Sequence, residues 1–212
     1  MIVLRALLLS GVLSSLLYIL MNIVVPMRWP GYSPFAHTVS ELSAVGAPTR
    51  MSWVWPSFLY SAMIIAFGLG VRLAASGQRN VRSIGGLLLT YGLVCSLWPL
   101  APMHQRGVLA AGGATLSDTL HLVLAGITVV LMLVTMGLGA ASFGRNFRRY
   151  TIGSMIVLAV FGALTSLEAE DVNKDLATPW IGLWERINIG VFLVWIVVLA
   201  VNLWPVRVGH NE

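Results

Sequence analysis

Length, composition and charge already exclude a soluble domain. The chain has 212 residues, of which 58% are hydrophobic and only 10% charged, and its mean hydropathy is +0.86. A soluble domain carries roughly 25% charged residues, so this composition predicts an integral membrane protein. The formal net charge of +5 does not indicate nucleic-acid binding, because the arginines lie beside apolar runs, where basic residues control topology. The single Cys95 excludes an intrachain disulfide.

Six apolar runs are long enough to cross a bilayer, which takes about twenty residues. They cover residues 4–25, 52–75, 82–102, 117–141, 150–168 and 182–204. The first run is too long for a signal-peptide core, so we expect it to be retained. Only helices and closed barrels satisfy their backbone hydrogen bonds in lipid, and uninterrupted runs of this length indicate helices. We therefore predict an all-α, polytopic fold: one membrane domain over residues 1–212, built as a bundle of six transmembrane helices.

Basic residues are distributed unequally between the two sides of such a bundle, and an excess of lysine and arginine marks the cytoplasmic side. The side of the termini carries Arg5, Arg72, Arg79, Arg82, Arg145, Arg148, Arg149 and Arg207. The opposite side carries Arg28, Arg50, Arg106, Lys174 and Arg186. We therefore predict a multi-pass protein of the cell membrane with both termini cytoplasmic. All acidic residues except Glu212, and all histidines except His210, fall on the opposite, extracytoplasmic side, where we expect the chemistry.

A polar segment, GYSPFAHTVSELSAVGAPTR (residues 31–50), separates the first two apolar runs. Ser33 followed by proline is typical of a helix start, and Gly46 is typical of a stop. The segment therefore predicts a short amphipathic helix of about ten residues, lying on the outer surface or over the mouth of the bundle. His37 and Glu41 are spaced to hold one ion or proton together. An ordinary interfacial helix with a solvated polar face is the alternative.

The third and fourth apolar runs bring further ionisable residues to the same depth. His104 and Arg106 follow the proline-rich end of the third run, and in ATLSDTLHLVLAG Thr115 and Asp118 are spaced as a helix capping box. His121 shares a helical face with Asp118, and it must face the bundle interior or a watery cavity. A pair of Asp118 with His121 would fix the histidine tautomer, as in a general base. Capping alone is the structural explanation of Asp118.

Two ionisable residues open the sixth run. Glu185 and Arg186 are adjacent and therefore about 100° apart around a helix. We expect one of them to point into the bundle and to pair with Asp118, His104 or Arg106.

Four stretches resemble a known family: GYSPFAHTVSELSAVGAPTR, PMHQRG, LSDTLHLVLAG and WERINIGVFLVW. Over essentially the whole chain they look like the bacterial membrane family catalogued as domain of unknown function 998 (DUF998). The resemblance implies a six-span protein of the bacterial inner membrane with no established activity. The positions that match the family pattern are Ser40, Glu41, Leu42, His121 and Arg186. Many relatives carry Pro-x-Asp at the end of the third span, where this chain has His104 in place of the aspartate.

Together these residues predict an outward-facing pocket. Binding is assigned to Ser40, Arg106, Glu185 and Arg186, catalysis to Glu41, Asp118 and His121, and metal ligation to His37, His104 and His121. The leading hypothesis is a protein that binds a lipid or small molecule without catalysis. The first alternative is a zinc-dependent lipid or amide hydrolase of the outer leaflet, in which zinc would lower the pKa of bound water to about 7.

A looser analogy supports that alternative, since alkaline ceramidase-like hydrolases look like seven-span proteins that hold zinc with Ser, Asp and three His. This chain lacks the seventh span and the paired histidines on a late helix, and it contains no H-E-x-x-H, G-x-S-x-G or C-x-x-C motif. A transporter is a further alternative, opposed by the scarcity of ionisable residues in the cytoplasmic half, and haem or quinone chemistry comes last. The sequence thus leaves enzymatic activity, cofactor and substrate open. Membrane lipids are the expected partners, and glycines such as those in MGLGAASFG allow a homo-oligomer or a membrane partner.

Overall fold

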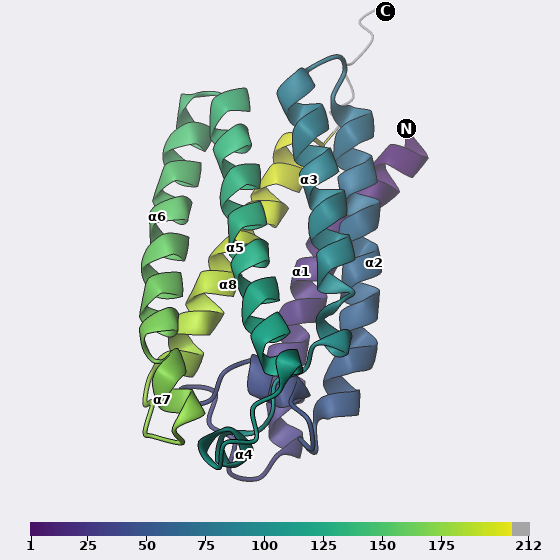
Figure 1. Cartoon of the computed structure of the whole chain (residues 1–212). Helices are drawn as coiled ribbons and strands as arrows, with labels where there is room; N and C mark the ends of the chain where they lie inside the picture. Colours follow the sequence, from purple (N-terminus) through teal and green to yellow (C-terminus); the bar gives the residue numbers. More distant parts are fainter. Residues whose placement is uncertain (205–212) are drawn as a thin grey trace, which may run out of the picture.

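The computed structural model describes residues 1–204, and Arg207, His210 and Glu212 lie outside the described residues. Six long helices form the molecule (Figure 1). They are α1 (Ile2–Val24), α2 (Arg50–Ala74), α3 (Arg79–Cys95), α5 (Leu116–Ser142), α6 (Arg145–Leu167) and α8 (Ile181–Asn202). Each belongs to a segment that is long and apolar enough to cross a membrane. The prediction of an all-α, multi-pass bundle with six spans is therefore confirmed.

Successive helices run in opposite directions, so the connections gather at two ends (Figure 1). The terminal end holds the N-terminus, the turn between α2 and α3, and the turn between α5 and α6. The loop end holds the three longer connections. These contain the short elements η1 (Pro26–Arg28), η2 (Ser40–Ser43), η3 (Trp98–Leu100), α4 (Arg106–Ala110) and α7 (Ala169–Asn173).

Two helix boundaries differ from the hydropathy pattern. Helix α3 ends at Cys95 rather than near residue 102, because Pro99 and Pro102 lack the N–H that would continue it. Helix α6 already begins at Arg145, directly after its N-cap Gly144. The basic sequence RNFRR is therefore the first part of a helix and not a loop.

The polar segment between α1 and α2 does not form the predicted amphipathic helix of ten residues. One turn follows Ser33, and after it only the 3-10 helix η2 forms. The segment is also not amphipathic in the predicted sense, since Glu41 is 3% exposed whereas Phe35 is 54% exposed. The physical reason is tertiary: Glu41 is drawn inward by hydrogen bonds that local periodicity does not encode.

The terminal half of the bundle is densely packed. A Cβ atom built on Gly85 of α3 would lie 2.7 Å from the carbonyl oxygen of Gly68 in α2, so these two helices approach at backbone distance. Trp195 of α8 is completely buried, stacks on Phe192, and donates its indole N–H to Thr151 Oγ1 at 3.0 Å. This core fixes the helices from which the loop-end residues project.

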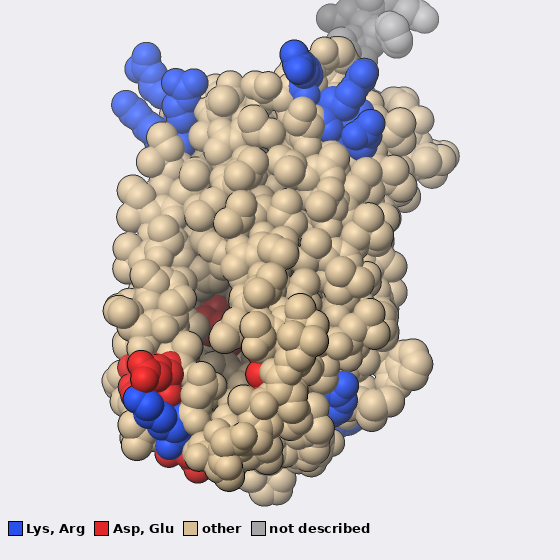
Figure 2. Space-filling model, viewed as in Figure 1, with Lys and Arg blue, Asp and Glu red and all other residues tan. Residues whose placement is uncertain are grey.

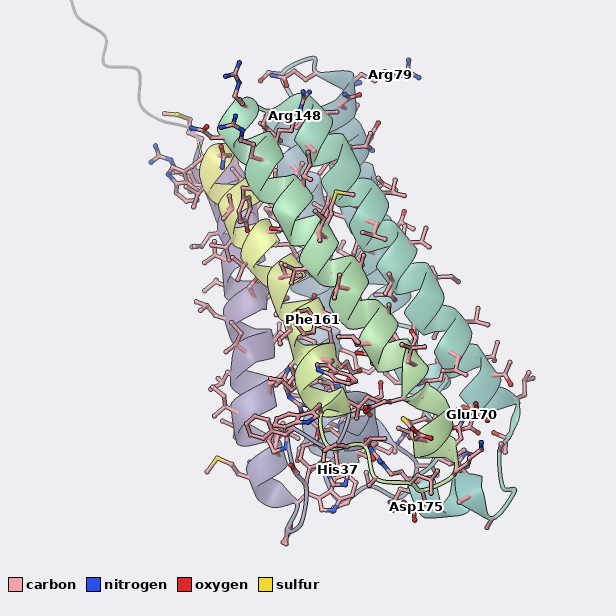
Figure 3. All side chains as sticks on the ribbon, turned by 90° about the vertical axis from the view of Figure 1, so that its left-hand side faces the viewer. His37, Arg79, Arg148, Phe161, Glu170 and Asp175 are labelled. Atoms are coloured by element: carbon pink, nitrogen blue, oxygen red, sulfur yellow. The ribbon has the colours of Figure 1, made fainter. Side chains whose placement is uncertain are left out.

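Charge separates the two ends of the molecule. In the space-filling view, lysine and arginine side chains crown the terminal end, whereas acidic side chains lie only toward the loop end on the visible face (Figure 2). Arg79 and Arg148 project from the terminal end, while His37, Glu170 and Asp175 lie at the loop end (Figure 3). The loop end therefore contains the chemically versatile residues.

Candidate functional site

Residues 29–49, here called the cap, fold across the loop-end mouth of the bundle (Figure 1). A buried ion pair holds the cap in place. Arg106 Nε donates to Glu41 Oε1 at 2.6 Å, and Arg106 Nη2 donates to Glu41 Oε2 at 3.0 Å. Two further donors reach the same Oε2, the backbone N–H of Thr38 at 2.6 Å and its hydroxyl at 3.0 Å. The bidentate geometry is that of a strong charge-assisted pair.

Arg106 also connects the cap to the segment that precedes α8. Its Nη1 donates to Thr178 Oγ1 at 2.7 Å, and its Nη2 donates to the carbonyl of Ala36 at 2.9 Å. Thr178 in turn donates to Ala36 O at 3.0 Å. The Glu41–Arg106 pair is therefore a structural clamp between three segments, and its atoms are occupied rather than presented to a ligand.

Arg186 binds the backbone of the cap from the first turns of α8. Its Nη1 donates to the carbonyls of Pro34 (2.7 Å) and His37 (3.0 Å), and its Nη2 donates to the Tyr32 hydroxyl at 2.6 Å. Tyr32 donates onward to Thr38 O at 2.7 Å. Burial raises the pKa of the Tyr32 hydroxyl, and the nearby Arg186 charge opposes that rise only in part. Tyr32 therefore stays neutral and can both donate and accept.

Glu185, the neighbour of Arg186, points to the other side of the cap. Its carboxylate accepts hydrogen bonds from the backbone N–H of Val39 and, at 3.4 Å, from Ser40 Oγ. The predicted partners Asp118, His104 and Arg106 are not the ones it uses. Within residues 1–204 Glu185 forms no ion pair, which leaves a carboxylate inside the bundle with neutral partners only.

Asp118 pairs with His104, whereas the predicted partner was His121. Its Oδ2 lies 2.9 Å from His104 Nδ1, and its Oδ1 accepts from the His104 backbone N–H at 2.7 Å. The predicted capping box is confirmed, since the Thr115 hydroxyl accepts from a backbone N–H of the first turn and Asp118 accepts from Thr115 N at 2.8 Å. A parallel bridge between Val45 and His104 joins this unit to the cap. Asp118 therefore joins α5 to the loop that follows α3.

His121 is almost fully buried, with 6% of its surface exposed. Its Nδ1 lies 2.9 Å from the carbonyl of Ala101, and its ring contacts the Trp98 ring edge-on at a centroid distance of 4.6 Å. The carbonyl fixes the proton on Nδ1, which leaves Nε2 as an acceptor. The prediction that His121 faces the bundle interior is confirmed.

The three histidines proposed as metal ligands have separate partners. His37 Nδ1 accepts from the Ser33 N–H at 3.0 Å, and its ring stacks on Tyr32, whereas His104 and His121 are engaged as described above. Among residues 1–204 no group of three or more His, Cys, Asp or Glu side chains is placed to share a metal ion. The geometry therefore does not support His37, His104 and His121 as a common zinc site.

Two neighbouring hollows lie beneath the cap. An inner cavity of about 120 Å³ lies inside the bundle, and a side cleft of about 360 Å³ lies between α5, α6, α7 and α8. Ser40, His121 and Glu185 line both of them. Figure 2 shows the corresponding face hollowed between α5 and α6, with acidic side chains visible inside the hollow. The remaining lining of the side cleft is largely apolar and includes Leu122, Ala125 and other residues.

Sequence reasoning missed the hydroxyl groups of the inner cavity. Tyr18, Tyr60 and Tyr91 line it together with several serines, and the hydroxyls of Tyr60 and Tyr91 lie 3.1 Å apart. A tyrosine within a transmembrane helix needs a partner for its hydroxyl, and this was the available signal. The cavity thus places one carboxylate, one imidazole acceptor and several hydroxyls in a lining that is otherwise mainly apolar.

Comparison with known proteins identifies a family but no activity. Neither curated proteins nor solved structures give a match to the chain. The model of the family described as protein of unknown function (DUF998) matches residues 12–202, which contain every site residue discussed above. The resemblance noted from the sequence motifs is therefore confirmed, and the chain belongs to the DUF998 family.

Proposed function

We propose that the protein binds an amphipathic small molecule or lipid, with the ligand's polar head between Glu185 and His121 and its apolar part in the side cleft. The observation that carries this proposal is the shared wall of the two hollows: Ser40, His121 and Glu185 face both of them. An ionisable residue inside a membrane bundle is a functional-site candidate by default.

The chemistry of the shared wall favours a ligand head that donates hydrogen bonds. Glu185 has only neutral partners, and a buried carboxylate is stabilised strongly by a cation or by further donors. No hydrogen bond from a described residue reaches Nε2 of His121, which leaves a second acceptor. An amine or hydroxyl head group satisfies both acceptors at once.

The shape of the side cleft favours entry from the bilayer. Its volume of about 360 Å³ falls within the range of ligand pockets, roughly 300–1,000 Å³. It opens between α5 and α6 (Figure 2), two helices whose other faces carry exposed apolar side chains such as Val123 and Ile156. A ligand with an alkyl chain can therefore move from the membrane to Glu185 without crossing water.

The proposal places the loop end on the extracytoplasmic side of the cell membrane. The terminal end carries the larger number of arginines, and such an excess marks the cytoplasmic side. In a Cys95→Ser background, an impermeant maleimide applied to intact cells should label Ala111→Cys at the loop end and not Gln78→Cys at the terminal end. The reverse labelling would refute this orientation.

Binding is tested with hexadecylamine and hexadecanol, which have equal chains and differ in head charge, on protein reconstituted in nanodiscs. We expect saturable binding that favours the amine. Glu185→Gln should weaken amine binding about tenfold or more, since a charge-assisted hydrogen bond contributes about 1.5–3 kcal/mol. The matched control is Glu170→Gln, which removes an exposed carboxylate that lines neither hollow.

A second pair of variants tests the entry route. Ala125→Phe fills the side cleft and should abolish binding of both probes. Gly126→Phe adds the same bulk at the next residue, where a Cβ meets no atom within 4 Å, and should bind like the parent protein. Amine binding that survives both Glu185→Gln and Ala125→Phe would overturn the proposal.

A further inference from the structure

A third hollow lies between α1 and α8 and faces the bilayer. This α1–α8 groove has a volume of about 600 Å³, and its lining includes Ile19, Asn22 and Ile23 of α1 and Arg186, Gly190 and Leu193 of α8. The two helices lie side by side in Figure 3. Ile19 and Ile23 are 45% and 59% exposed, so the groove is open along an apolar wall.

Two buried polar atoms of the lining residues lack a hydrogen-bond partner. Arg186 Nε is an unsatisfied donor and Asn22 Oδ1 is an unsatisfied acceptor, although the amide nitrogen of Asn22 donates to Tyr18 O at 3.0 Å. An unsatisfied buried polar group is unfavourable by comparison with a bonded one. Both atoms are buried but belong to side chains that line the groove, so a head group that carries an acceptor and a donor satisfies them once these side chains turn toward it.

Arg186 is also the only charged residue among those that line the groove. All its hydrogen-bond acceptors are neutral: the carbonyls of Pro34, His37 and Gly182 and the hydroxyl of Tyr32. In the described part of the chain no carboxylate forms an ion pair with it. Backbone carbonyls satisfy the N–H groups of a membrane-embedded arginine but do not neutralise its charge, so the groove keeps a positive charge that favours an anion.

We propose that the α1–α8 groove binds one anionic phospholipid, with its phosphate at Arg186, its head-group hydroxyl at Asn22 and an acyl chain along Ile189, Gly190 and Leu193. A guanidinium is well suited to phosphate because it presents several N–H groups in a planar fork. The depth is also appropriate. Asn22 is close to the end of α1 and Arg186 close to the start of α8, and at 1.5 Å per residue both lie within about two turns of the interface.

The groove and the inner cavity share Tyr18, Val39 and Ile189, but each has its own charged residue. Glu185 and Arg186 project about 100° apart, so one lines the inner cavity and the side cleft while the other lines the groove. A lipid in the groove would stabilise the cap from outside, because Arg186 also holds the cap carbonyls. Loss of amine binding and loss of phospholipid binding are therefore separate results.

The test is native mass spectrometry of the whole protein with phosphatidylglycerol or phosphatidylcholine of identical chains. Gly190→Leu fills the groove without touching the cap, since a Cβ built there meets no atom within 4 Å. Gly153→Leu is the matched control, because that glycine is equally unobstructed but lies on α6 away from the groove. We expect the parent protein and Gly153→Leu to retain phosphatidylglycerol about tenfold more strongly than phosphatidylcholine, and Gly190→Leu to lose this retention.

A charge variant tests the head-group contact. Arg186→Gln should reduce the preference for phosphatidylglycerol about tenfold, whereas Arg28→Gln, which removes an exposed arginine at the same end, should leave it unchanged. If Arg186→Gln fails to fold, the Gly190→Leu comparison decides alone. Equal retention of both lipids by the parent protein, or unchanged retention by Gly190→Leu, overturns the proposal and identifies the bound lipid as non-specific.

Discussion

The two ends of the bundle use the same charged residue in opposite ways. At the terminal end, Arg79 and Arg148 lie exposed around short turns (Figure 3), and Arg148 makes one exposed hydrogen bond, to the carbonyl of Ala140. At the loop end, Arg106 and Arg186 are turned inward and bind the backbone of the cap. Exposed arginines require no specific partners, whereas inward-facing ones must be satisfied individually. The connections at the loop end therefore form an ordered structure with defined hollows, whereas those at the terminal end are little more than turns between helices.

The packing of the interior also differs between the two halves. Around Phe67 and Trp195 the terminal half contains fully buried aromatic rings in contact with neighbouring helices. Toward the loop end, hydroxyls, His121 and Glu185 surround open volume instead. Close packing gives stability. The cavities of the loop-end half therefore indicate that this half is adapted to a role other than stability.

The largest effect is expected where the clamp of the loop end is broken. Arg106→Leu leaves the Glu41 carboxylate buried without its cation. Removing one partner of a buried pair costs about 3–5 kcal/mol, and we expect that loss in the free energy of unfolding, measured by denaturant titration in mixed micelles. Arg79→Leu at the terminal end, where the side chain is exposed, should change it by less than about 0.5 kcal/mol.

A double variant separates charge burial from loss of the cap. Glu41→Leu combined with Arg106→Leu should recover part of the loss, because an apolar pair replaces a buried ion pair at little net cost. Equal destabilisation by Arg106→Leu and Arg79→Leu would contradict the contrast between the two ends.

A smaller effect is expected at the contact between the cap and α8. Gly182 donates its N–H to Phe35 O at 2.8 Å, and a Cβ at this position would overlap the carbonyl oxygens of Pro34 and His37. Gly182→Ala should therefore destabilise the protein by about 1–3 kcal/mol, as overpacking does. Limited proteolysis of the cap should accelerate in parallel.

Gly153→Ala is the matched substitution for that test. Its Cβ would meet no atom within 4 Å, and alanine favours a helix over glycine by about 0.8–1.0 kcal/mol. The two alanine variants should therefore shift stability in opposite directions. A stabilising Gly182→Ala would show that the cap is not seated on α8.

The six spans could be predicted because a bilayer fixes both the length and the polarity of a helix that crosses it. The capping box of Thr115 and Asp118 was equally predictable, since its atoms are three residues apart. The partners of Glu41 and Asp118 were not. Glu41 finds Arg106 across 65 positions of the chain, and Asp118 finds His104 in the preceding loop. Such pairings depend on how loops fold over the bundle, which periodicity within one helix does not record.

The clearest difference between prediction and structure concerns His121. The sequence placed it correctly inside the bundle, because an imidazole in lipid would leave its nitrogens unsatisfied. Its partner is nevertheless a backbone carbonyl, that of Ala101. This carbonyl is free to accept because α3 ends at Cys95 and the α-helix does not continue to Ala101. Every residue type has a backbone carbonyl, so no sequence motif predicts this contact.

Beside the Glu41–Arg106 ion pair, the cap is held by hydrogen bonds to its main chain. Arg186 donates to the carbonyls of Pro34 and His37, and Arg106 donates to the carbonyl of Ala36. Glu185 accepts from the N–H of Val39. Main-chain groups are present whatever side chain a position carries. At cap positions that contribute only main-chain groups, the amino acid can therefore vary widely among relatives. Insertions and deletions there should be rare among relatives, since one added residue would move every peptide group out of reach.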